Sequence, residues 1–576
     1  MRAMLLRWCN DLFLVLVLAA VTWSTLALGA VWGWGLAITF GLLAAAFCLW
    51  TALRIFASEA REMARQAATV PAESAEAEEA ADDEEDAAVE ASPAAGRRLN
   101  LATYTKLKAY RLAPRLRVRA PVGAVLLLLL VGCMILQVAP LPRSVVGLLS
   151  PRRVVLEQRF GEALNEAAPS LLTLSVDPEN SRRALALAAM ALMAFAAGAY
   201  LATRRRQARR AVRVLLLMAL AEAAYGMFEE LSGHHHLFWI PVEGDFARGT
   251  FFNRNHFAAT LALLLPMSIG WFYFRAAAAK SRHDETHVLP ATSWDILGSR
   301  QGLWLLAPAI LVLAILQSQS RGGFASMALG VGLMFVIGAR TKLVRRFAWL
   351  ALPLALLVLA SGVSSDYEEL FARFGQQGVV ESGRLRFWSD GLQIVRQYPI
   401  FGVGLGNFPR VYMQVSTGET VHYPFQAHNE WLEALITLGF VGAALALVML
   451  IGFFAKAFRR IRRAGPDQPW LLGAWCGLCG LALHSVGEFN LHIPSIAITA
   501  ALLAGMLLGF STTIRARTHG QRSGTPRRSR RSRTIVKGSR RVIGTAPAGH
   551  AEPVEAEPVI ESVPEDTVVD PSGQPV

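Results

Sequence analysis

Long stretches of apolar residues recur along the chain and are separated by polar segments. A helix crosses the hydrocarbon of a bilayer with roughly 20 mostly apolar residues, because its backbone hydrogen bonds then form within the segment. The pattern predicts an all-α, polytopic membrane protein with about twelve transmembrane helices. The predicted spans lie near residues 12–29, 33–55, 120–140, 183–203, 212–231, 256–275, 301–318, 323–339, 348–364, 429–455, 470–488 and 495–513.

Two polar regions contain too few large apolar residues to bury a core. The acidic, alanine-rich run Glu73 to Glu90, followed by the basic segment Arg97–Arg119, predicts a disordered cytoplasmic loop. The last part of the chain is rich in Arg, Ser, Pro and Gly, and predicts a disordered basic tail. The expected organisation is two transmembrane helices in 1–56, the loop 57–119, a transmembrane region over 120–513 and the tail 514–576.

Composition supports a membrane protein, since 53% of residues are hydrophobic and only 17% are charged. The net charge of +14 would indicate nucleic acid as a partner in a soluble chain. With the N-terminus placed inside, however, most of the 57 lysines and arginines fall in cytoplasmic segments, as the positive-inside rule requires. The basic surplus is therefore a topology signal. We expect membrane lipids around the protein and no nucleic acid as a partner.

The polar residues that this topology places on the opposite face concentrate in a few segments. The longest, 365–428, is rich in aromatic residues, which favours an ordered exterior loop with short helices. Arg384 and Arg386 are predicted at the start of a short amphipathic helix. The glycines in 402–408 imitate a dinucleotide-binding fingerprint, but the strand, loop and helix context is missing, so we predict a tight turn against the membrane face.

Arginine and histidine are the candidate functional residues of this face. Arg321, in a tight turn between two apolar helices, needs a water-filled cavity or an anionic partner, although it could also end a helix by snorkelling. Guanidinium groups such as those of Arg384 and Arg386 bind diphosphate oxygens well because two donors engage one anion. His428, at the exterior end of a helix, can take up a proton at neutral pH. A structural histidine is the alternative.

Further polar residues are expected to support these groups. Arg254 and His256, at the start of the sixth span, line the same cavity or cap the helix. Glu488 pairs with an arginine or orients His428, as supporting carboxylates do. The three consecutive histidines 234–236 cannot all face one ion from a regular element, so we expect no metal site and no cofactor.

The motifs together resemble the O-antigen ligase and polymerase superfamily of bacterial envelopes. They are Ser320-Arg321-Gly322-Gly323, Ser382-Gly383-Arg384 with Trp388, Pro399-Ile400-Phe401-Gly402-Val403-Gly404-Leu405-Gly406-Asn407-Phe408, and His428-Asn429-Glu430-Trp431-Leu432 with Gly439 and Gly442. The segment Asn253–Ala258 fits the same group. The specific resemblance covers residues 250 to 510, and four motifs occur in family order on one predicted face.

The resemblance implies a glycosyltransferase of the inner (cytoplasmic) membrane whose active site faces the periplasm. The donor would be a saccharide on undecaprenyl diphosphate, and neither metal nor nucleotide would take part. Arg321 and Arg384 match the family arginines that hold the diphosphate, and His428 matches the histidine that deprotonates the acceptor. Arg386, Arg254, His256, Asn429, Glu430 and Glu488 are the expected supporting residues. Attack opposite the leaving group would invert the anomeric centre.

Three functions remain open. A ligase would transfer the glycan to lipid A core or to a protein side chain, whereas a polymerase would transfer it to another lipid-linked repeat unit of an O-antigen or exopolysaccharide. We favour the ligase-family description, with the polymerase second. A polysaccharide transporter or flippase is the third reading, but transporters often contain repeated halves, and residues 1–290 and 291–576 show no self-similarity.

Overall fold

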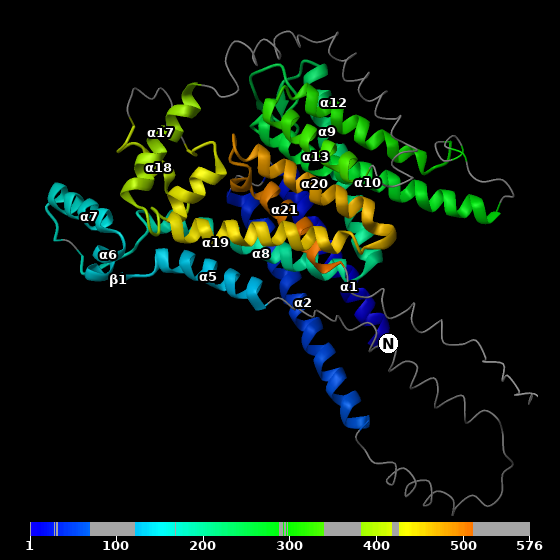
Figure 1. Ribbon diagram of the computed structural model, residues 1–576, viewed down its shortest axis with the longest axis horizontal. Helices are drawn as coiled ribbons and strands as arrows, with labels where there is room; N and C mark the ends of the chain where they lie inside the picture. The colour runs from blue at the N-terminus through cyan, green and yellow to red at the C-terminus, as the bar shows by residue number, and fades with distance from the viewer. Residues whose placement is uncertain are drawn as a thin grey trace, which may run out of the picture. The chain divides into compact units, whose positions relative to one another are not determined.

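The computed structural model describes residues 2–27, 29, 33–68, 121–167, 169–286, 292, 295, 298–338, 382–416 and 425–510. The described chain is almost entirely helical, and its strands form two antiparallel pairs, β1 with β2 and β3 with β4 (Figure 1). The helices are α1 (Arg2–Leu26), α2 (Gly33–Ala68), α5 (Pro121–Val138), α6 (Arg143–Leu149), α7 (Pro151–Leu164), α8 (Pro178–Ala202), α9 (Arg205–Leu231), α10 (Arg254–Thr286), α12 (Leu306–Gln317), α13 (Arg321–Gly338), α17 (Ser382–Gln397), α18 (Phe408–Tyr412), α19 (Glu430–Ile461), α20 (Gln468–His484) and α21 (Pro494–Gly509). The strands are β1 (Leu141–Pro142), β2 (Leu171–Leu172), β3 (His236–Leu237) and β4 (Ile240–Pro241), and the 3-10 turns are η2 (Gly302–Leu305), η4 (Gly465–Asp467) and η5 (Asn490–His492).

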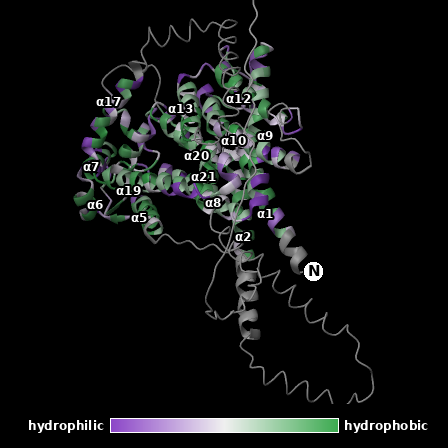
Figure 2. Cartoon of the chain, turned by 45° about the vertical axis from the view of Figure 1, so that its right-hand side comes forward, coloured by the Kyte–Doolittle hydropathy of each residue, from purple (hydrophilic) through white to green (hydrophobic). Residues whose placement is uncertain are grey.

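The all-α, multi-pass membrane architecture predicted from the sequence is confirmed. Among the described residues, 7 helices are long and apolar enough to cross a membrane: α1, α2, α8, α9, α10, α13 and α19. Shorter apolar helices, α5, η2 with α12, and α21, occupy three further predicted spans. Figure 2 shows hydrophobic residues along much of this bundle and more hydrophilic ones on α17. The predicted span 470–488 corresponds to α20, which has 17 residues.

Some predicted boundaries differ from the structure. The helix α2 continues to Ala68, beyond the predicted span 33–55 and into the predicted disordered loop. The reason is that its last part, Ser58 to Ala68, is rich in Ala, Glu, Arg and Met, which favour helix without being apolar. The ninth predicted span, the rest of the loop 57–119 and the tail 514–576 lie outside the described residues, so a count of twelve stays a prediction.

Glycines allow the central helices to approach closely. α10 packs along α20, and α8 packs along α21 (Figure 1). A Cβ atom on Gly477 of α20 would lie 2.0 Å from the Leu263 carbonyl oxygen of α10, and one on Gly505 of α21 would lie 2.0 Å from the Phe195 carbonyl oxygen of α8. Backbone therefore lies directly against backbone at both crossings, which is how small residues hold membrane helices together.

The helix α19 is interrupted at Gly439, whose φ of 66° and ψ of −175° are not helical. The glycine-rich loop after α17 fills the interruption: Val403 N–H donates to the Ile436 carbonyl at 3.0 Å. From α5, the Gln137 side-chain amide donates to the carbonyls of Phe401 and Thr437, both at 2.7 Å. Irregular backbone near a bilayer needs such internal partners. The predicted tight turn is thus built into the broken helix.

The polar end of α20 is held by a buried ion pair. Asp467, at the start of α20, is 0% exposed, and its carboxylate oxygens accept from Arg209 Nε at 2.8 Å and Nη2 at 2.9 Å. Trp470 Nε1 donates to the same carboxylate at 2.9 Å. This forked contact fixes the start of α20 against the start of α9. The residues of the predicted active site lie near the other end of α20.

Candidate active site

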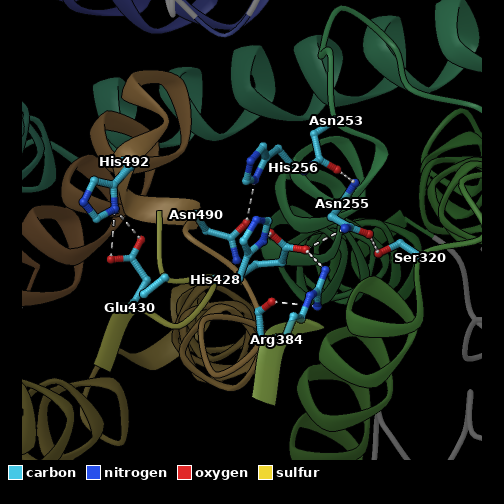
Figure 3. A network of polar contacts seen from close by, with 12 residues as sticks. Asn253, Asn255, His256, Ser320, Arg384, His428, Glu430, Asn490 and His492 are labelled. Atoms are coloured by element: carbon cyan, nitrogen blue, oxygen red, sulfur yellow. Dashed lines mark hydrogen bonds and ion pairs between the residues drawn. The ribbon is translucent and has the colours of Figure 1, made fainter. Parts of the chain in front are cut away.

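The candidate site lies where α10, α13 and α19 begin and α20 ends, which we call the site end of the bundle. The helix α17 and the turn between α20 and α21 complete it (Figure 3). Hydrogen-bonded partners in the site are as far apart along the chain as His256 and Asn490, which are 234 positions apart. Helix packing alone brings them together.

Glu488 is the centre of the polar network. Its side chain is 2% exposed. Oε1 accepts hydrogen bonds from Asn255 Nδ2 at 2.6 Å and from Arg384 Nη2 at 2.7 Å, and Oε2 lies 3.3 Å from His428 Nδ1. One carboxylate therefore joins α10, α17 and the start of α19.

The contacts of Glu488 keep its side chain ionised. Burial by itself would raise the pKa of this carboxyl group, because it disfavours the charged form. The hydrogen bond from His428 and the positive charge of Arg384 act in the opposite direction and lower the pKa to about 2. Glu488 is consequently a permanent negative charge next to the imidazole and the guanidinium.

The short helix predicted within residues 365–428 is confirmed as α17. Arg384 lies in the first turn of this helix. Its Nη1 donates to the Gly487 carbonyl at 2.8 Å, beside the ion pair with Glu488. Trp388, one turn later, donates from Nε1 to the Ala427 carbonyl at 3.1 Å. The same helix thus holds Arg384 and the segment that carries His428.

His428 has an unusual backbone conformation for a residue with a side chain, with φ of 48°. Two contacts hold it: the Ala427 N–H donates to Glu433 Oε2 at 2.9 Å, and the side chain of Asn429 caps α19 by accepting the Leu432 N–H at 3.0 Å. Strained backbone that its surroundings enforce is typical of functional sites. Because Nδ1 faces Glu488, an Nδ1–H tautomer leaves Nε2 as an acceptor.

His492 forms a second polar cluster close to the first. Its Nδ1 lies 3.3 Å from Glu430 Oε2, and its Nε2 lies 3.3 Å from Glu433 Oε1. Burial alone would lower the pKa of this imidazole, but the two carboxylates raise it to about 10. The protonated ring therefore ties the first turn of α19 to the start of α21. Since Glu433 also binds Ala427 N–H, this cluster fixes the residue that precedes His428.

The segment at the start of α10 caps its helix and also contacts the site. Asn253 Oδ1 accepts the Asn255 N–H at 2.8 Å, as a cap does. Asn255 also accepts from Ser320 Oγ at 2.7 Å, and His256 Nδ1 lies 3.1 Å from Asn490 Oδ1 (Figure 3). Asn253 therefore caps the helix, Asn255 and His256 contact other residues of the site, and the lining of a cavity stays a prediction.

The arginines predicted for the site have different surroundings in the structure. Arg321 is the first residue of α13 and follows Ser320, so its backbone belongs to the site end. Arg254 lies over the Phe246 ring, with Cζ 4.3 Å from the ring centroid. Arg386 shares α17 with Arg384, and among the described residues no hydrogen bond joins it to Glu488.

Several residues of the site were not singled out from the sequence. The sequence motifs assign no individual role to Asn255, Ser320, Glu433, His484, Asn490 or His492. Glu433 follows His428 by five positions and is an acidic residue within an apolar span. Such a residue is itself a signal of a functional or paired group, so the sequence could have identified Glu433. The uncharged residues offer no such signal, because their contacts depend on the packing of distant helices.

Comparisons with known proteins give two sequence matches. Residues 306–447, which include Arg321, Arg384 and His428, match the family model described as O-antigen ligase. The exopolysaccharide production protein ExoQ of Rhizobium meliloti (strain 1021) is 23% identical over 319 residues, which are 50% of this chain and 66% of that protein, just under two thirds of its length. The motifs, their order, the helical architecture and both matches agree: over part of its length, the chain is similar to the O-antigen ligase and polymerase superfamily.

Proposed function

We propose that the protein is an integral membrane glycosyltransferase that moves a glycan from undecaprenyl diphosphate to an acceptor hydroxyl. We place it in the bacterial inner membrane with its site end toward the periplasm. The observation that carries the proposal is the Glu488 network, which holds Arg384 and His428 on a single carboxylate. An imidazole beside a fixed cationic group is the arrangement that this transfer requires.

His428 is the general base of the proposed reaction. The acceptor oxygen attacks the anomeric carbon, its proton passes to His428 Nε2, and the bond between the anomeric carbon and the diphosphate oxygen breaks with its electron pair on the diphosphate. Glu488 holds Nδ1–H and stabilises the imidazolium that forms, as a carboxylate does behind a catalytic histidine. Attack from the side opposite the diphosphate inverts the anomeric centre.

Arg321 and Arg384 are the proposed diphosphate-binding groups. The leaving diphosphate gains negative charge as the bond breaks, and nearby guanidinium groups stabilise that charge. Glu488 offsets one of these two positive charges, so the pair remains cationic overall. Arg254, Arg386 and His256 contribute polar surface around them, while Asn429 and Glu430 position His428 through α19.

The acceptor separates two forms of the proposal. The primary form is a ligase, whose acceptor is lipid A core or a protein side chain. The second is a polymerase, whose acceptor is another lipid-linked repeat unit. The Rhizobium meliloti relative, named as an exopolysaccharide production protein, favours this form. A transporter remains the alternative from another class.

Replacing His428 by alanine tests the proposal. A strain that lacks the gene would be complemented with the wild-type chain, with His428→Ala or with His235→Ala, a control histidine on the β3–β4 hairpin. Loss of a general base lowers the rate by about 100-fold or more, so we expect His428→Ala to be inserted at the wild-type level without restoring surface glycan. His235→Ala should restore it.

The lipid-linked material that accumulates identifies the reaction. Long chains on the carrier indicate a missing ligase, and single repeat units indicate a missing polymerase. Donor that accumulates on the cytoplasmic face would instead indicate a transporter and contradict the proposal. Wild-type glycan in the His428→Ala strain would remove His428 from the mechanism.

A further inference from the structure

His484, the last residue of α20, is a buried imidazole whose two ring nitrogens have no hydrogen-bond partner among the described residues. It is 3% exposed. A buried polar group without a partner destabilises the folded protein. Such a group in a native structure requires an explanation, and an ordered water, an ion or a ligand supplies one.

The ring of His484 faces the N-terminus of α13. A Cβ atom on Gly322 would lie 2.5 Å from both Nε2 and Cδ2 of His484. Only a residue without a side chain leaves the ring in this position. The backbone N–H of Gly322, in the first turn of α13, donates to none of the described residues. Two polar groups without partners thus adjoin each other at a helix N-terminus, where negative charge is stabilised.

The same turn belongs to the candidate active site. Ser320, just before α13, donates to Asn255, which in turn donates to Glu488 (Figure 3). His484 precedes Glu488 by four positions in the chain, and Gly322 directly follows Arg321, the residue proposed to bind diphosphate. His484 and Gly322 therefore adjoin the candidate active site.

We propose that His484 Nε2–H and the Gly322 backbone N–H donate hydrogen bonds to one phosphate group of the lipid diphosphate. This inference rests on the proposed function and adds two phosphate-contacting groups to it. Because Gly322 has no side chain, the His484 imidazole and the phosphate can both lie next to the first turn of α13. His484 acts on the leaving group, whereas His428 acts on the acceptor.

Substitution by phenylalanine distinguishes this role from a structural one. If His484 only fills space, His484→Phe removes two unpartnered polar atoms at similar shape, and the substitution is neutral or stabilising. If His484 binds phosphate, the same substitution lowers the affinity for undecaprenyl diphosphate about tenfold, or 1.4 kcal/mol. Affinity would be measured by titrating undecaprenyl diphosphate into the full-length protein in nanodiscs, with undecaprenol as the uncharged probe.

Two glycines of α13 provide a matched pair. Gly322→Ala places a methyl group against His484 and should also reduce diphosphate affinity. Gly332→Ala lies on the same helix, where a Cβ atom meets nothing within 4 Å, so binding should be unchanged. Thermal unfolding of each variant confirms that binding is compared between folded proteins.

The outcomes separate this inference from the proposed function. If the wild type does not bind undecaprenyl diphosphate in preference to undecaprenol, the donor assignment itself is wrong. If the wild type binds it, and both His484→Phe and Gly322→Ala bind as well as Gly332→Ala, the donor assignment stands and the role of His484 is refuted. Loss of affinity in His484→Phe with unchanged unfolding supports the inference.

Discussion

Glu488 shows how a single buried residue determines the chemistry of this site. Its carboxylate contacts an amide, a guanidinium and an imidazole, and each partner comes from a different helix or helix boundary. A buried ion pair contributes little net stability, but removing one partner leaves the other charge uncompensated. Glu488 therefore matters for the position and charge of Arg384 and His428 more than for stability by itself.

The substitution Glu488→Gln should reduce both activity and stability. It keeps the shape of the side chain but removes the charge, so Arg384 loses its counterion and His428 loses the acceptor that fixes its tautomer. We expect a loss of about 3 kcal/mol in the free energy of unfolding and of about 100-fold in turnover. Glu162→Gln, at an exposed position of α7, is the control and should change neither.

The pH dependence of this loss follows from the lowered pKa of Glu488. The folded-state pKa is about 2 and the ordinary value is 4.5, so the stabilisation is fully present above pH 4.5 and disappears as the pH falls through about 2. Unfolding of the wild type and of Glu488→Gln in detergent would be compared at pH 7 and pH 3. A difference that grows toward acid pH would contradict the assigned ionisation.

The broken helix α19 illustrates the element scale, because its interruption connects the glycine-rich loop to the site. Gly439 adopts a backbone conformation that is essentially restricted to glycine. A Cβ atom there would lie 2.3 Å from the Ile400 carbonyl oxygen. The loop thus lies directly against the break, about three turns from His428. Its position sets how α17 meets the start of α19.

Gly439→Ala should disrupt the contact between the glycine-rich loop and the interruption of α19. Both the unfavourable backbone conformation and the collision with Ile400 oppose the alanine, and we expect a loss of about 3 kcal/mol or more in the free energy of unfolding. Gly452→Ala, on the same helix, is the control because a Cβ atom there has no neighbour within 4 Å. Thermal unfolding in detergent measures both, and equal stability of the two variants would show that the break does not constrain the fold.

Sequence reasoning predicts some of these elements well for a physical reason. Apolar runs must become helices in a bilayer, so the spans at α8, α9 and α19 follow from hydropathy. The interruption at Gly439 does not, because the residues around it remain apolar and the compensating hydrogen bonds come from α5 and the loop after α17. Likewise, Arg384 and His428 could be nominated from their residue types, whereas Asn255 and His484 owe their significance to helix packing.

At the scale of the whole molecule, two ionic clusters of the described residues lie at different ends of the bundle. The network around Glu488 occupies the site end, and the ion pair of Asp467 with Arg209 lies at the opposite ends of α20 and α9. The separation suits an enzyme whose substrate reaches the site from one side of the membrane. A carrier, by contrast, binds its substrate near the midplane.

This division predicts which residues are accessible from each side of the membrane. In a variant without the five native cysteines, Asp245→Cys samples the exposed segment between β4 and α10, and Arg462→Cys samples the exposed end of α19. Lysines and arginines favour the cytoplasmic side, and the end of α19 carries Arg459 and Arg460. A membrane-impermeant maleimide should therefore label Asp245→Cys in intact spheroplasts and Arg462→Cys only after permeabilisation. The reverse pattern would place the site end in the cytoplasm, where a periplasmic transfer from undecaprenyl diphosphate is excluded.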